Sequence, residues 1–87
     1  MVVNEKTLIY KNPEEGHEYI MTVDVSKGRG QDYSTFSIID MTSRPFKQVA
    51  TFRDNVISPL LFPDVLFNYS ISFNVLYWVI IYLPFNI

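Results

Sequence analysis

The chain has 87 residues, so it is long enough for one small domain and too short for several. Seven Lys and Arg residues against nine Asp and Glu residues give a net charge of −2, which excludes a globally basic surface that would attract nucleic acid or anionic lipid. The lack of cysteine excludes disulfides, thiolate nucleophiles and cysteine-based zinc sites. All charged residues lie between Glu5 and Asp64, so residues 65–87 form an uncharged, aromatic-rich tail.

The first 17 residues are polar and end in turn formers and charged residues, from Asn12 to His17. The turn formers exclude a regular element over residues 12–17, and we expect a linker or incoming arm over residues 1–17. No basic segment followed by an apolar one occurs near the start, so we expect no signal peptide. The next segment, from Glu18 to Val25, is rich in β-formers, bounded by glycines and largely apolar on both faces. It predicts a strand in the centre of a sheet.

Two more strands and a helix are predicted before the tail. Tyr33 to Asp40 and Gln48 to Asp54 are rich in β-formers, and three short strands joined by short loops form an antiparallel meander most economically. After Pro59, apolar side chains up to Phe73 recur at the spacing of one helix face. This spacing predicts a single amphipathic helix.

The tail contains one more predicted strand. Its densest apolar run, Val75 to Leu83, has nine residues before Pro84, whereas a membrane-spanning helix needs roughly 20 apolar residues. We therefore expect a buried strand and no membrane span. A strand that follows a helical crossover lies most naturally parallel to the first strand. The predicted fold is α/β, with the element order β-β-β-α-β.

Asp24 is the first candidate for chemistry, because a carboxylate at the end of a hydrophobic strand is costly to bury without a cation or hydrogen-bond donors. Hard cations such as Mg²⁺ bind proteins through one or two such carboxylates. The alternative is a strand-end residue that accepts N–H groups from the next loop. Asp32 lies across that loop, and pairing of the flanking strands would bring it near Asp24. The alternative for Asp32 is an exposed loop residue.

The loop between the first two predicted strands has features of a phosphate contact. Lys27 and Arg29 alternate with Gly28 and Gly30, which offers cations and a close backbone approach to a phosphate. The loop lacks the third glycine and the following helix of a dinucleotide-binding motif. The sequence also has no Gly-Lys-Ser/Thr phosphate loop, so it does not encode an ATPase.

His17 is the only histidine, and it precedes the first predicted strand. No second metal ligand is spaced near it as a metal site requires, so we expect a solvated turn residue. The aromatic residues of the helix and tail, from Phe62 to Trp78, have no interleaved Lys or Arg. This pattern favours core packing over stacking on nucleic-acid bases.

Two stretches of the chain resemble a known family. They are HEYIMTVDVSKGRGQDY, from His17 to Tyr33, and SIIDMTSRPFKQVATFRDNVISPLLFPDV, which ends at Val65. Both resemble the start of the C-terminal nuclease domain of phage large terminase subunits, in the branch of T-even-like tailed phages. The resemblance covers about Asn12 to Asn74 and is most specific in D-x-S-x-G-x-G-x-D-Y and L-F-P-D. It implies an incomplete RNase H-like domain over residues 18–87.

Members of this family cut concatemeric double-stranded DNA with two divalent metals, Mg²⁺ or Mn²⁺, that acidic residues hold. The resemblance implies that Asp24 is the first catalytic aspartate and a metal ligand, and that Asp32 is an acidic neighbour at the metal. Lys27 and Arg29 then become contacts to DNA phosphates. The implied partners of the full-length protein are DNA, the motor ATPase domain, the portal and the small terminase. The implied location is the host cytoplasm, with no membrane.

The resemblance fades from about residue 66. The second catalytic residue of the family is a glutamate at the end of the strand after the helix, and an ungapped alignment from Asn74 puts Ile81 there. The third catalytic acid of the family lies beyond residue 87. We therefore expect a fragment with a divergent tail that is inactive alone. The alternatives are a non-enzymatic binding or assembly module, and another RNase H-like nuclease such as a junction resolvase.

Overall fold

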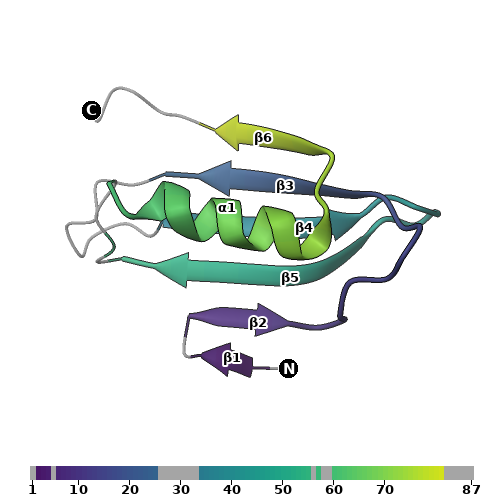
Figure 1. Ribbon diagram of the computed structural model, residues 1–87, viewed down its shortest axis with the longest axis horizontal. Helices are drawn as coiled ribbons and strands as arrows, with labels where there is room; N and C mark the ends of the chain where they lie inside the picture. The colour runs from purple at the N-terminus through teal and green to yellow at the C-terminus, as the bar shows by residue number, and fades with distance from the viewer. Residues whose placement is uncertain (1, 5, 26–33, 56, 58–59, 82–87) are drawn as a thin grey trace.

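The computed structural model describes residues 2–4, 6–25, 34–55, 57 and 60–81. In these residues the order of elements is β1 (Val2–Asn4), β2 (Thr7–Ile9), β3 (Tyr19–Asp24), β4 (Ser34–Asp40), β5 (Lys47–Asp54), α1 (Phe62–Phe73) and β6 (Tyr77–Ile81). The strands form one sheet in the order β1-β2-β5-β4-β3-β6, and α1 lies across one face of it (Figure 1). The predicted α/β class is confirmed.

The segment predicted as a linker or arm, residues 1–17, contains two strands, because β1 and β2 belong to the sheet. β2 pairs antiparallel with β5, with Leu8 opposite Thr51, and β1 pairs antiparallel with β2. Each of the two strands has only three residues, too few to establish a period of two in the sequence. The predicted order β-β-β-α-β is therefore incomplete at its start.

The middle of the sheet is an antiparallel meander of β3, β4 and β5. Tyr19 at the start of β3 lies opposite Asp40 at the end of β4, and Asp24 lies opposite Thr35. After α1 the chain returns as β6, which runs parallel to β3. β3 thus has a partner on each side, which confirms the central position predicted for the segment from Glu18 to Val25.

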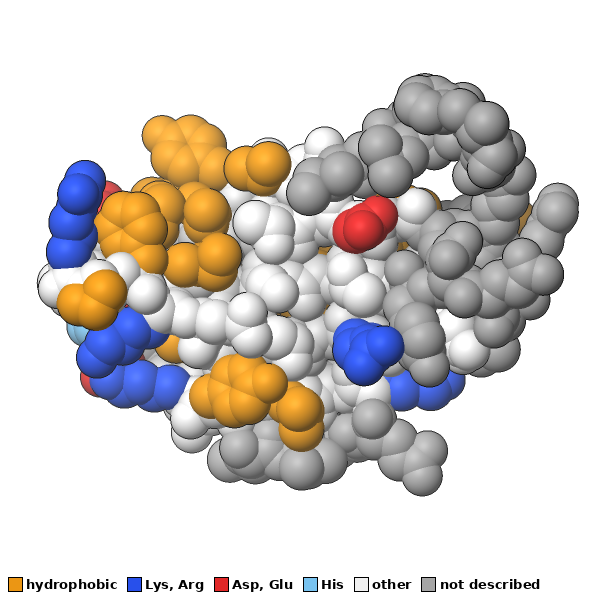
Figure 2. Space-filling model, turned by 180° about the vertical axis from the view of Figure 1, so that it is seen from behind, with side chains coloured by type: hydrophobic (Ala, Val, Ile, Leu, Met, Phe, Trp, Pro, Cys, Tyr) orange, Lys and Arg blue, Asp and Glu red, His pale blue; other side chains and the backbone are white. Residues whose placement is uncertain are grey.

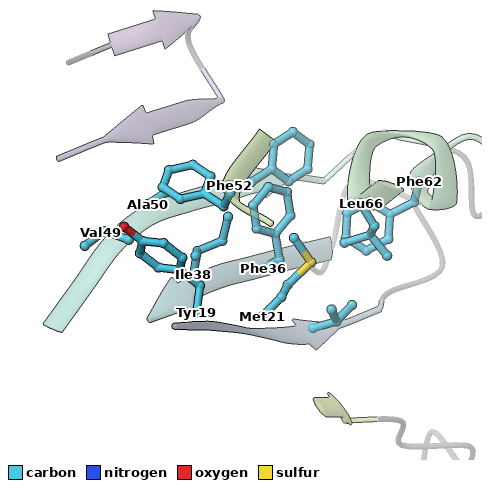
Figure 3. Packing of buried hydrophobic residues seen from close by; sticks show 11 residues of the cluster. Tyr19, Met21, Phe36, Ile38, Val49, Ala50, Phe52, Phe62 and Leu66 are labelled. Carbon is cyan, nitrogen blue, oxygen red and sulfur yellow. The ribbon is translucent and has the colours of Figure 1, made fainter. Parts of the chain in front are cut away.

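The hydrophobic core lies between α1 and the face of the sheet that it covers. The helix has Pro63 in its first turn and is capped at its C-terminus by Asn74, whose φ of 52° is the left-handed conformation that terminates helices. Aromatic rings of the helix contact those of the sheet at centroid distances of 5.2 to 5.8 Å. Each fully buried large side chain contributes about 2 kcal/mol. The buried apolar residues are Tyr19, Met21, Val23, Phe36, Ile38, Val49, Ala50, Phe52, Phe62, Leu66 and Phe73 (Figure 3).

The other face of the sheet is not covered by a helix in the described part of the chain, and hydrophobic side chains gather on it in separate groups (Figure 2). The prediction of a buried tail strand is wrong, because the side chains from Tyr77 to Ile80 are 39 to 65% exposed. The physical reason is the position of β6 at the edge of the sheet, where β3 is its one neighbouring strand among the described residues. The Trp78 indole N–H donates a hydrogen bond to Ser70 Oγ.

The helix of the described residues is also too short to cross a membrane.

Candidate functional site

Asp24, the residue that the sequence favours for catalysis, is the last residue of β3 and is exposed. The period of two along the strand explains this position, because Tyr19, Met21 and Val23 all point into the core and Asp24 lies on the opposite face. Asp24 is therefore hydrated, and it needs no cation to offset a cost of burial.

The loop of residues 26–33 lies outside the described residues, and it includes the predicted site residues Asp32, Lys27 and Arg29. On the other side of Asp24, the parallel strand β6 places Ile81 as the register partner. Ile81 is the position at which the family resemblance puts a second catalytic glutamate.

Another acidic residue, Asp54, ends β5 near the same end of the sheet. Its side chain is buried on the face that α1 covers, so it lies on the opposite face from Asp24. Lys6 Nζ lies 2.9 Å from Asp54 Oδ2, and the Ile57 N–H donates to Asp54 Oδ1 at 3.1 Å. Within the described part of the chain, no group of three or more metal-ligand side chains includes Asp24. The described residues around Asp24 thus do not fit a two-metal centre.

A cluster of metal-ligand side chains lies at the other end of β3 and consists of Glu14, His17 and Asp40. Asp40 ends β4 opposite Tyr19, so the pairing of β3 with β4 brings it beside residue 17. His17 Nδ1 lies 2.7 Å from Asp40 Oδ2 and 3.5 Å from Glu14 Oε2. One ligand atom from each residue lies within 4.8 Å of the other two. The Glu14–His17–Asp40 cluster therefore has the donor types and the spacing of a possible metal site.

A tight turn brings Glu14 and His17 to the same side of the chain. The His17 N–H donates to the Glu14 carbonyl at 3.2 Å, and Gly16 between them has a φ of 83°. A positive φ at this third position of the turn is easy for glycine and costly for most other residues. The Tyr19 hydroxyl accepts the Glu14 N–H at 2.9 Å, and its ring lies 6.2 Å from the His17 ring. Tyr19 is itself fixed in the core by an edge contact with Phe73 at 5.4 Å.

The Asp40 carboxylate is anchored by Thr42. The backbone N–H and the hydroxyl of Thr42 both donate to Asp40 Oδ1, at 2.9 and 2.5 Å, so Oδ2 faces His17. Burial alone would raise the pKa of Asp40, but the hydrogen bonds from Thr42 and His17 outweigh it and lower the pKa from 3.8 to about 2. Asp40 is consequently ionised at neutral pH although its side chain is only 10% exposed.

A pocket of about 270 Å³ opens beside Glu14 and His17, lined by residues 13–17 and by residues 72–74 at the end of α1. The prediction of a solvated turn histidine without a second metal ligand is wrong, because Asp40, 23 residues away in the sequence, lies 2.7 Å from His17 Nδ1. The sequence does contain one local signal of the cluster, the spacing of three residues between Glu14 and His17. No protein-family model matches the chain.

Proposed function

We propose that this chain forms part of an RNase H-like nuclease domain of the kind found in phage large terminase subunits, with Asp24 as its first metal-binding carboxylate. The observation that supports the proposal is the position of Asp24. It is the exposed last residue of a central strand, and its register partner is the last residue of the parallel strand that follows α1. The resemblance places the first two catalytic acids of the family at these two positions.

In this proposal the chain supplies the sheet, the helix and one carboxylate. An exposed carboxylate binds hydrated Mg²⁺ or Mn²⁺ weakly, and Ile81 offers no ligand atom. Because the described residues around Asp24 do not fit a two-metal centre, hydrolysis by this chain alone is not part of the proposal. Double-stranded DNA, the motor ATPase domain, the portal and the small terminase are the partners that the proposal implies, in the host cytoplasm.

Restoring the second acid tests the proposal. Neighbouring strands lie about 4.8 Å apart, so Ile81→Glu adds a carboxylate within reach of an ion bound at Asp24. We expect Mn²⁺ to broaden the Asp24 amide NMR signal at a concentration at least about tenfold lower in I81E than in the unmodified chain. Ile81→Gln is the matched control without the charge, and Asp24→Asn added to I81E should abolish the gain. Equal Mn²⁺ responses of I81E and I81Q would argue against this role of Asp24.

One observation favours a second candidate function, that of a non-enzymatic assembly module. The edge strand β6 has exposed apolar side chains from Tyr77 to Ile80 and no charge, whereas edge strands of monomeric proteins usually carry charges that prevent pairing. Concentration-dependent self-association in sedimentation experiments, lost in Val79→Lys and retained in D24N, would favour this candidate. A monomer at all concentrations would argue against it.

A further inference from the structure

We propose that the Glu14–His17–Asp40 cluster binds one transition-metal dication such as Zn²⁺, at a site separate from Asp24. The cluster offers one imidazole nitrogen and two carboxylate oxygens. Nitrogen donors favour Zn²⁺ and its neighbours in the first transition row over Mg²⁺, which prefers oxygen ligands throughout. Asp24 lies five residues along β3 from Tyr19, which is the register partner of Asp40, so about 17 Å separates the two locations.

The distances between the ligand atoms suit an ion among them. Two atoms that each lie about 2.1 Å from a tetrahedral Zn²⁺ are about 3.4 Å apart. The 3.5 Å between His17 Nδ1 and Glu14 Oε2 already matches this separation. The 2.7 Å between His17 Nδ1 and Asp40 Oδ2 is a hydrogen bond, and it must lengthen by about 0.7 Å when the ion replaces the proton. The Glu14 side chain is exposed, so it has room to adjust its rotamer to the ion.

The groups behind the ligands hold them ready for an ion. Thr42 occupies Asp40 Oδ1 with two hydrogen bonds, which leaves Oδ2 for the metal. Hydrogen bonds of this kind orient the carboxylate ligands of metal sites, and their loss typically lowers metal affinity by about 10- to 100-fold. The Tyr19 hydroxyl fixes the backbone of Glu14, and the Tyr19 ring lies alongside His17. The pocket beside the cluster leaves room for the water molecules that complete the coordination of a three-ligand site.

One cation already competes for the cluster. Lys11 Nζ lies 3.1 Å from Glu14 Oε2, the same oxygen that lies nearest to His17. A metal ion must displace this ammonium group or share the carboxylate with it. Removing the charge of Lys11 should therefore strengthen metal binding, a gain that damage to the fold cannot imitate.

Calorimetric titration of the tag-free chain with ZnSO₄ tests the proposal. We expect saturable binding of one Zn²⁺ per chain, an affinity loss of at least about tenfold in His17→Gln and in Asp40→Asn, and a gain of about twofold to fivefold in Lys11→Met. Glu15→Gln is the matched control, because Glu15 is an exposed residue of the same turn that lies outside the cluster. The E15Q chain should bind Zn²⁺ with the same affinity as the unmodified chain.

The readout is specific because the chain has one histidine and no cysteine. Zn²⁺ should therefore shift the ring signals of His17 in the NMR spectrum of the folded chain in step with the calorimetric saturation. Non-saturable heats, or equal Zn²⁺ affinity in the unmodified chain and in H17Q, would overturn the proposal. Weaker binding in K11M than in the unmodified chain would also contradict it.

Discussion

Asp24 and Ile81 are register partners at the ends of the parallel strands β3 and β6. Because the two strands run in the same direction, both residues lie at the same end of the sheet. Asp24 has an exposed carboxylate, whereas Ile81 has no ligand atom. Of this register pair, only Asp24 therefore offers a carboxylate to a hydrated divalent cation.

This relationship predicts that the unmodified chain does not cleave DNA. Stabilising both the attacking and the leaving oxygen of a phosphodiester takes two metals, and one carboxylate does not hold them. Supercoiled plasmid incubated with the chain and Mg²⁺ or Mn²⁺ should remain supercoiled on an agarose gel. Nicking that requires metal and disappears in Asp24→Asn would contradict the prediction and show a complete catalytic centre.

The anchoring of Asp40 predicts a loss of stability in acid. The pKa of Asp40 is about 2 in the folded chain and near 3.8 when unfolded, so the unfolded chain binds the proton more tightly. The contribution of Asp40, up to about 2 kcal/mol, is complete above the unfolded pKa and is lost as the pH falls from about 4 towards 2. Urea unfolding between pH 5 and pH 2.5 measures it.

Two variants isolate that contribution from other acidic groups. Asp40→Asn cannot titrate, and Thr42→Val removes the hydroxyl that donates to Asp40 Oδ1. Both should show a shallower dependence of the free energy of unfolding on pH over this window than the unmodified chain. An identical pH dependence in D40N would mean that Asp40 is not the group responsible.

Local patterns in the sequence were sufficient to predict β3 and the end of α1. The enrichment in β-forming residues between flanking glycines predicted β3 within one residue at each end, and apolar spacing predicted the end of α1 at Phe73. The sequence could not show that β6 lies at an edge, because an apolar run indicates strand propensity and says nothing of what covers the strand. It also could not show β2, which is stabilised by pairing with β5 rather than by a pattern of its own.

The two candidate sites also differ in how far the sequence predicts them. A strand-end carboxylate such as Asp24 can be predicted from the sequence because a local pattern predicts the strand that it ends. The contact between His17 and Asp40 depends on the register of β3 with β4 across 23 residues, which no local spacing encodes. The hydrophobic run that ends at Asp40 instead suggested an ordinary strand end.

Substitutions of one buried and one exposed phenylalanine test the position of the hydrophobic core. Phe36 is 1% exposed, and its ring lies 5.2 Å from those of Phe52 and Tyr69. Phe36→Ala should cost about 3 to 5 kcal/mol, most of the stability of a small domain. Phe46→Ala is the matched control, because Phe46 is 53% exposed and the Arg44 guanidinium lies 5.6 Å from its ring, so it should cost less than about 1 kcal/mol. Similar melting temperatures for the two variants would contradict this packing.

Gly16 tests whether the turn that joins Glu14 to His17 depends on backbone conformation. An added Cβ at Gly16 would meet no atom within 4 Å, so any cost of a side chain there comes from the φ of 83° and not from a clash. Gly16→Ala should destabilise the chain by about 1 kcal/mol and weaken Zn²⁺ binding, because alanine moves the two ligands apart. Gly16→Asn should cost less, since asparagine adopts positive φ more readily. Urea denaturation measures the loss of stability, and the Zn²⁺ titration measures the loss of affinity. Equal losses in G16A and G16N would show that the turn does not depend on the positive φ of residue 16.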